Sequence, residues 1–130
     1  MSYKAPKRFR LTRRSDIDAL FAEGVSVRDR LATMVVRPNG LGFARVAVGV
    51  SKRHGNAVRR NRIKRLCREA LRLGRSGLAV GYDYMLLPRP HAKLTLAGLQ
   101  KSITLLGRRV AEAQAGDGAD RQPRPARREP

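Results

Sequence analysis

The sequence predicts a small two-layer α+β domain, in which three helices and three strands enclose one modest apolar core. Two observations predict this class. Apolar and small residues alternate over residues 44–50, as in a strand. They recur at steps of three and four within residues 57–73 and 95–110, as in amphipathic helices. A chain of 130 residues with 42% hydrophobic side chains fits one domain.

One short helix and two strands are predicted in the first fifty residues. Ser15 is the expected N-cap of a helix over residues 16–23, with acidic residues in its first turn. Residues 30–37 form a strand that the Pro-Asn-Gly turn at 38–40 ends, and residues 44–50 form the next strand. We expect these two strands to pair as an antiparallel hairpin.

A long basic helix is predicted from its N-cap, Asn56, to the glycines at 74 and 77. One side is apolar: Ile63, Leu66, Cys67, Ala70 and Leu71. The opposite half is polar and cationic: Asn61, Arg62, Lys64, Arg65, Arg68 and Arg72. Residues 51–74 carry nine Lys and Arg side chains against one acid, Glu69. A solvated face normally mixes signs, so this one indicates contact with a polyanion.

The rest of the chain gives a third strand, a last helix and a tail. Residues 82–87 form the strand, and Thr95 caps a helix with an apolar stripe from Leu96 to Val110. We therefore place the domain at residues 1–113, with a basic arm at 1–14. This arm is either a loose tail or a segment that follows a nucleic-acid strand. Residues 114–130 lack apolar periodicity, which predicts a disordered tail.

The net charge indicates the class of partner, and the cysteine content indicates the cellular compartment. A net charge of +19, from 29 Lys+Arg and 10 Asp+Glu, favours nucleic acid over a membrane surface or an acidic protein. The single cysteine, Cys67, excludes an intramolecular disulfide, favours a reducing cytosolic setting and is expected in the core. No apolar run approaches the roughly 20 residues of a membrane span. The N-terminus is not a secretory signal, although its basic composition is compatible with a transit peptide.

The ionisable residues predict that the protein holds no catalytic site of its own. A nuclease needs clustered carboxylates for magnesium or a histidine poised as a base. Asp16 and Asp18 point to different sides of a helix, and the other acids, Asp83 among them, are scattered and fit solvated or helix-end roles. His54 and His91 lie in separate loops, and His54 fits a phosphate neighbour or loop residue better than a catalyst.

Two adjoining segments carry a resemblance to a known family. Val-Gly-Val-Ser-Lys at residues 48–52 and Gly-Asn-Ala-Val-Arg-Arg-Asn-Arg-Ile-Lys-Arg-Leu-Cys-Arg-Glu at residues 55–69 resemble the signature of the bacterial ribonuclease P protein component. The match continues through Arg-Phe-Arg-Leu at 8–11 and Gly-Tyr-Asp-Tyr at 81–84. The resemblance implies a mixed four-stranded sheet, three helices and a left-handed βαβ crossover, a rarity among such units. The fourth strand would come from a division of residues 26–37 or from a neighbouring loop.

In function, the resemblance implies the protein subunit of a cytoplasmic ribonucleoprotein endonuclease. Its RNA subunit binds magnesium and removes the 5′ leader of precursor tRNA, while the protein binds that RNA and the leader. The protein itself holds no cofactor and needs no membrane or obligate protein partner. The implied contacts to the RNA subunit are Arg53, Asn56, Arg59, Arg60, Asn61, Arg62, Lys64, Arg65 and Arg68. The implied contacts to the leader, in a cleft, are Phe9, Arg10, Arg13, Ile17, Phe21, Val35, Val48, Val50, Ser51 and Lys52.

One departure from the family bears on how the leader is bound. The family often has aromatic residues where this chain has Ile17 and Val35, so base stacking is expected from Phe9 and Phe21 instead.

Three other functions compete with this one. A ribosomal or ribosome-associated RNA-binding protein would share the charge and the small domain, without needing this helix motif. A self-sufficient metallonuclease would cleave without any RNA subunit, and the scattered acids disfavour it. A nucleoid protein would bind duplex DNA as well as it binds structured RNA.

Overall fold

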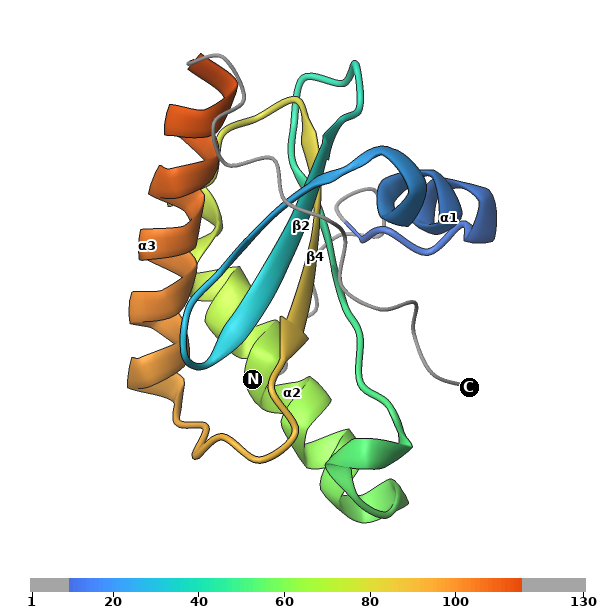
Figure 1. Cartoon of the computed structure of the whole chain (residues 1–130), viewed down its shortest axis with the longest axis vertical. Helices are drawn as coiled ribbons and strands as arrows, with labels where there is room; N and C mark the ends of the chain where they lie inside the picture. Colours follow the sequence, from blue (N-terminus) through green and yellow to red (C-terminus); the bar gives the residue numbers. More distant parts are fainter. Residues whose placement is uncertain (1–9, 116–130) are drawn as a thin grey trace.

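The computed structural model describes residues 10–115, which form three helices and a four-stranded sheet. The helices are α1 (Arg14–Glu23), α2 (Ala57–Gly74) and α3 (Leu96–Ala115). The strands are β1 (Val25–Arg28), β2 (Ala32–Pro38), β3 (Arg45–Val48) and β4 (Tyr82–Pro88). Short 3₁₀ turns, η2 (Lys52–His54) and η3 (Arg75–Gly77), precede and follow α2. Helices α2 and α3 cover one face of the sheet, and α1 lies against the other (Figure 1).

The strands lie in the order β1-β2-β4-β3, which makes the predicted hairpin of residues 30–37 and 44–50 wrong. Strand β4 separates β2 from β3; it runs antiparallel to β2 and parallel to β3. The physical reason lies in β4 itself, whose residues are buried on both faces of the sheet. Such a strand gains most from a central position, and it displaces the local pairing that the turn at 38–40 favours.

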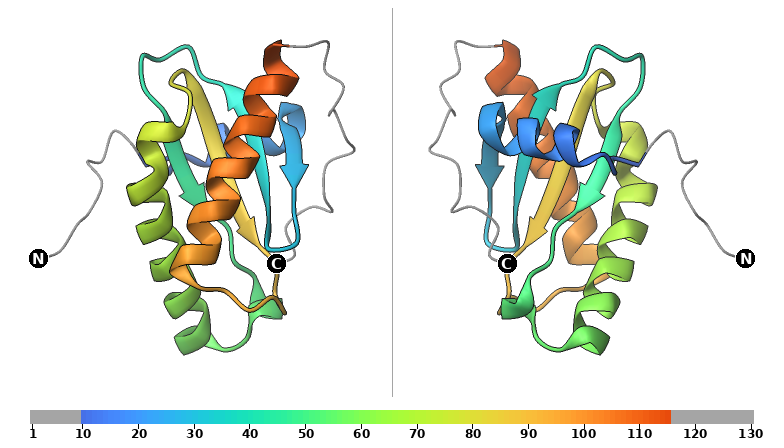
Figure 2. Two further views of the ribbon diagram at one scale, coloured as in Figure 1. Left: turned by 90° about the vertical axis from the view of Figure 1, so that its left-hand side faces the viewer. Right: turned by 90° about the vertical axis from the view of Figure 1, so that its right-hand side faces the viewer.

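Strands β3 and β4 are joined through α2 by a left-handed crossover, as the family resemblance implies. In the left-hand view of Figure 2 both strands run downward, β4 lies to the right of β3, and α2 passes on the viewer's side. The fourth strand is β1, and it confirms the expected division of residues 26–37. Asp29 makes the division, because its Oδ1 accepts hydrogen bonds from the backbone N–H of Leu31 (2.8 Å) and Ala32 (3.0 Å).

Two of the three predicted helix caps are confirmed. Asn56 Oδ1 accepts from the Arg59 N–H at 2.9 Å, and Thr95 Oγ1 accepts from the Gly98 N–H at 3.0 Å. Ser15 is not the cap of α1. The carbonyl of Arg13 accepts the first bond of that helix, from Ile17 N–H at 3.1 Å, so Ser15 lies inside the first turn.

The larger of two apolar clusters lies between the sheet and helices α2 and α3. Ile63, Cys67, Ala70 and Leu71 are buried there, which confirms the predicted core side of α2, while Leu66 is half-buried. The smaller cluster lies under α1 and comprises the buried residues Leu11, Leu20, Val35 and Met85. The sheet is therefore packed on both faces.

Complete burial of Cys67 predicts an unreactive thiol. Desolvation raises the pKa of Cys67 to about 12, so the thiol stays protonated at pH 8 in the folded protein. We expect a thiol-specific reagent at pH 8 to label Cys67 only after denaturant unfolds the chain, where the pKa returns to about 8.5. Rapid labelling of the native protein would contradict its place in the core.

Within residues 10–115, no helix is long and apolar enough to cross a membrane. Helix α3 extends through Ala115 and so includes the first two residues of the predicted tail. The rest of that tail lies outside the described residues, as does most of the basic arm.

Candidate nucleic-acid interface

The solvent-facing side of α2 is a cationic surface, which we call the α2 face. Its exposed members are Asn61, Arg59, Arg62, Arg65 and Arg68, and Arg60 and Lys64 are half-buried. The lower end of α2 extends past the end of β4 in both views (Figures 1 and 2). The first turn of the helix therefore stands clear of the sheet, with side chains exposed around most of its circumference. The structure thus places seven of the nine predicted contacts for the RNA subunit on one helix, while Asn56 is its N-cap and Arg53 lies on the η2 turn before it.

The α2 face lacks compensating negative charge. Glu69 is bound by Arg72, whose Nη2 lies 2.7 Å from Oε2, and these hydrogen bonds lower the pKa of Glu69. None of the other six cations of α2 has a carboxylate partner within residues 10–115. The positive end of the helix dipole adds to their field at the first turn, which carries no acid. A phosphate backbone would relieve this repulsion.

The turn before α2 fixes where the helix begins. Gly55 has φ of 116°, in the region that favours glycine, and a Cβ there would lie 2.6 Å from Arg59 Cδ. Ser51 opens the preceding η2 turn, and its Oγ accepts from the Arg53 N–H at 3.3 Å. Lys52 and Arg53 are exposed on this turn, while Ser51 is half-buried, so both cations extend the α2 face.

His54 is a structural residue of the η2 turn. Its side chain is buried, Nε2 donates to the Pro88 carbonyl at 2.7 Å, and Nδ1 accepts from the Ser51 N–H at 3.1 Å. Both ring nitrogens are thus engaged with the backbone. His54 is a loop residue, one of the two roles predicted for it, and it anchors the end of β4 to the turn before α2.

On the opposite side of the sheet lies a partly exposed apolar surface, which we call the α1 face. It comprises the half-buried residues Ile17, Phe21, Ala47 and Leu87, which pack over the smaller cluster. Two of the predicted leader contacts, Ile17 and Phe21, are therefore here. Val35 is not available to a ligand, because it is 0% exposed beneath α1. Gly24 permits this close packing, since a Cβ there would lie 2.8 Å from Val35 Cγ1.

The two remaining apolar residues predicted to contact the leader lie on the face of the sheet opposite α1. Val48 and Val50 pack against the larger cluster, with α2 and α3, because alternate residues of a strand share a face. Besides Arg45, the residues of that segment that face α1 are Ala47 and Gly49, and a Cβ on Gly49 would lie 2.6 Å from Leu87 Cδ2. Sequence reasoning missed Ala47 and Leu87, although the alternation over residues 44–50 carried the signal.

The remaining predicted leader contacts lie near β3 or outside the described residues. Arg10 forms a parallel bridge with Val46 on the outer edge of β3, and the next residue, Leu11, donates from its N–H to the Val46 carbonyl at 2.9 Å. Arg10 and Arg13 are exposed. Phe9 lies outside the described residues. Residues 10 and 11 therefore run along β3, the edge strand of the sheet.

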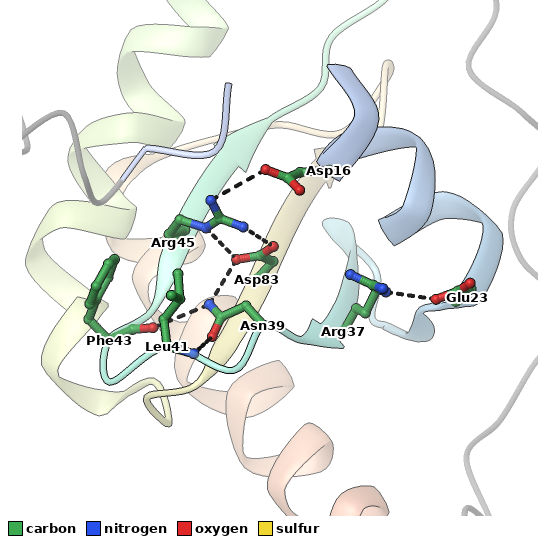
Figure 3. A network of polar contacts seen from close by, with 8 residues as sticks. All are labelled: Asp16, Glu23, Arg37, Asn39, Leu41, Phe43, Arg45 and Asp83. Carbon is green, nitrogen blue, oxygen red and sulfur yellow. Dashed lines mark hydrogen bonds and ion pairs between the residues drawn. The ribbon is translucent and has the colours of Figure 1, made fainter. Parts of the chain in front are cut away.

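An ion pair joins Arg45 of β3 to the buried carboxylate of Asp83 on the neighbouring strand β4 (Figure 3). Asp83 is 1% exposed and accepts from Arg45 Nε and Nη2, each at 2.8 Å, and from Asn39 Nδ2 at 2.9 Å. The hydrogen bonds to Asp83 raise the pKa of Arg45. The predicted solvated or helix-end role of Asp83 is therefore wrong. Its carboxylate is the structural partner of Arg45, and the position of Asp83 in the sequence gives no sign of this pairing.

The same arginine ties α1 to the sheet. Arg45 Nη1 lies 3.4 Å from Asp16 Oδ2 in the first turn of α1, and Arg37 of β2 binds Glu23 at its last residue at 2.9 Å. Helix α1 is thus paired to the sheet at both ends (Figure 3). Asp16 and Asp83 approach one another only through the guanidinium between them. Among residues 10–115 no group of three or more His, Cys, Asp or Glu side chains could hold a metal ion.

These features define a class of small, strongly basic α+β proteins built on a left-handed βαβ unit. The family model described as Ribonuclease P matches residues 5–111. The ribonuclease P protein component of Thermotoga maritima is 34% identical over 89 residues, which span 68% of this chain and 76% of that protein. The Dehalococcoides mccartyi component is 43% identical over 83 residues, or 64% and 68% of the two chains.

Solved structures agree with these sequence matches. The Thermotoga maritima RNase P protein superposes with a TM-score of 0.68 at 28% identity, covering 76% of this chain and 96% of that one. A Staphylococcus aureus RNase P protein mutant with defective mRNA degradation activity gives a TM-score of 0.70 at 30% identity, covering 82% and 90%. The chain belongs to the family of bacterial ribonuclease P protein components. It is therefore a subunit of an endoribonuclease, and the ribosomal, metallonuclease and nucleoid alternatives are set aside.

Proposed function

We propose that the α2 face binds the catalytic RNA subunit and that the α1 face binds the 5′ leader of precursor tRNA. The observation that carries this proposal is the α2 face itself, where six cations project from one helix and none pairs with a carboxylate of residues 10–115. Lys52 and Arg53 continue the same charge toward the end of β3. A polyanion on this surface gains from the release of its counterions, and Arg adds bidentate contacts to phosphate.

The α1 face suits a single-stranded leader because it is apolar, partly exposed and bordered by cations. Phe21 is half-buried on this face, and stacking of a base on an aromatic ring is worth about 1–3 kcal/mol. Arg10 on the edge of β3 and Arg13 before α1 are exposed for backbone phosphates. Ile17, Ala47 and Leu87 offer apolar contact without stacking, so Phe21 is the main stacking residue within residues 10–115.

The chemistry in this proposal belongs to the RNA. Cleavage of a phosphodiester needs an activated water and stabilisation of developing charge, both of which magnesium supplies. The one buried acid of the network, Asp83, is paired with Arg45, and the ring of His54 is hydrogen-bonded to the backbone. We place the magnesium requirement in the RNA subunit and the particle in the cytoplasm. The protein's part is to reduce repulsion between two polyanions and to favour substrate over product, which has no leader.

Leader length tests the proposal. We expect reconstituted holoenzyme to bind precursor tRNA with a long leader more tightly than mature tRNA, and Phe21→Ala to weaken only the former. Loss of one stacked base corresponds to about 5- to 150-fold in Kd. The matched control is Leu105→Ala, an exposed apolar residue on the far side of the sheet. Protein alone should leave precursor tRNA uncut at any magnesium concentration.

Two results would contradict the proposal. If a one-nucleotide leader gained as much affinity from the protein as a long leader, the α1 face would not be the leader site. If the protein cleaved precursor tRNA without the RNA subunit, the chemistry would not belong to the RNA.

A further inference from the structure

Four arginines converge on the turn between β1 and β2, at the edge of the sheet away from α2. Arg28 is the last residue of β1, and Arg30 lies in the turn itself. Arg89 follows β4, and its Nε donates to the carbonyl of Asp29 at 3.2 Å. Arg109 comes from α3, and its Nη1 donates to the carbonyl of Arg28 at 2.6 Å. All four residues are exposed, and we call them the edge patch.

The turn that gathers them is rigidly built. Asp29 caps it through Oδ1 and closes it with a backbone bond from its N–H to the Ala32 carbonyl at 3.0 Å. The Arg89 N–H donates to the Leu31 carbonyl at 2.8 Å, which fixes the segment after β4 against the same turn. The patch is thus a preformed arrangement of three chain segments, which reduces the ordering cost of binding.

The edge patch carries uncompensated positive charge. None of its four arginines has an ion pair in the part of the chain that the structure describes. Asp29 contributes one negative charge, and its carboxylate is turned to backbone N–H groups. A guanidinium has five N–H donors, so Arg89 and Arg109 keep most of theirs after one bond to a carbonyl. Oriented guanidinium groups of this kind match the oxygens of a phosphate.

The edge patch and the α2 face are separate surfaces. In the strand order β1-β2-β4-β3 the patch lies at the β1 edge, where α3 packs, while α2 packs on β3 at the other edge. The two views of Figure 2 show the β1–β2 turn and α2 near opposite edges of the sheet. One short RNA segment along α2 therefore leaves the patch uncovered.

We propose that the edge patch is a second contact for a phosphodiester backbone, so that the protein bridges two RNA segments across its sheet. The inference rests on the proposed function. The backbone has two possible sources, the RNA subunit or precursor tRNA, and both present the same phosphate chemistry. Bridging by opposite edges would let this subunit fix the distance between two RNA elements as well as neutralise their charge.

Salt dependence tests the bridge. The variant is Arg28→Gln/Arg30→Gln, because neither side chain bonds to another described residue and the fold should be unaffected. The control is Lys101→Gln/Arg108→Gln, which removes two exposed charges from the solvent side of α3. One arm measures protein binding to the RNA subunit over a range of salt, and the other measures holoenzyme binding to precursor and mature tRNA.

In one arm we expect the log–log salt slope of the variant to become shallower by roughly 1.5, at about 0.7–0.9 per lost phosphate contact. The control should keep the wild-type slope. A change in the first arm assigns the patch to the RNA subunit, and a change in the second assigns it to tRNA. Slopes equal to the control in both arms would overturn the inference. The proposed function would survive that result if replacing Arg62 and Arg65 on the α2 face still flattened the slope.

Discussion

Replacing Arg45 with alanine is expected to destabilise the protein by about 3–5 kcal/mol, because it leaves a buried carboxylate without its partner. Asp83 is 1% exposed and receives two of its three side-chain hydrogen bonds from this guanidinium. The loss would also release Asp16, and with it one of the two pairs that hold α1 on the sheet. Urea unfolding followed by circular dichroism measures the change in the free energy of unfolding.

Two further variants separate burial from charge pairing. Adding Asp83→Asn to Arg45→Ala should recover part of the lost stability, because a neutral amide is cheaper to leave unpaired in the interior. Arg37→Ala is the matched control, since its partner Glu23 has a side chain that is 64% exposed. That pair should contribute less than about 1 kcal/mol. If Arg37→Ala and Arg45→Ala cost the same, the network around Asp83 would have no special role.

The largest effect on RNA binding is expected from Arg62→Ala/Arg65→Ala/Arg68→Ala. These side chains are exposed on the α2 face and pair with no described carboxylate, so their removal should leave the thermal melt nearly unchanged. Each lost phosphate contact should reduce the salt slope by about 0.7–0.9, which gives a total of about 2 to 3. Filter binding of the RNA subunit at several salt concentrations measures this slope.

Leu71→Ala is the complementary variant on the other side of the same helix. Leu71 is 1% exposed, so its truncation should cost about 2–5 kcal/mol of stability while the folded fraction keeps the wild-type slope. Leu66 is a weaker choice because it is only half-buried. The α2 face would lose its role as the main RNA contact if the triple variant kept the wild-type slope.

The sequence predicted what local patterns decide. The two faces of α2 follow from the spacing of Ile63, Cys67 and Leu71, and the caps Asn56 and Thr95 act on backbone groups three residues away. These features depend on the chain within a few turns of a helix. For that reason the spacing predicted most of the α2 face, namely Asn61, Arg62, Lys64, Arg65 and Arg68, whereas Arg59 and Arg60 were implied by the family resemblance. RNA binding by each remains a proposal.

What the sequence did not predict depends on residues far apart in the chain. The pairing of β3 with β4 places Arg45 opposite Asp83, 38 residues later, and no local signal shows that this acid is buried. The side of the sheet that each residue of 44–50 faces also depended on that pairing. Val48 and Val50, which the family resemblance implied as leader contacts, pack against the larger cluster. Ala47 belongs to the α1 face because α1 packs on the side of the sheet that Ala47 faces, and the position of α1 depends on contacts distant in the chain.

The central position of β4 bears on how the chain is made. Strand β3 has β4 as its neighbour in the sheet, and β2 needs β4 on its inner side, so the sheet stays incomplete until Pro88 has been synthesised. Up to that point the chain contains the β1–β2 hairpin and a cationic helix whose apolar side is uncovered. Long-range pairing of this kind slows folding relative to local contacts. A chain that ends before Pro88 therefore leaves uncovered the apolar side of α2, which packs against the sheet and α3 in the folded protein.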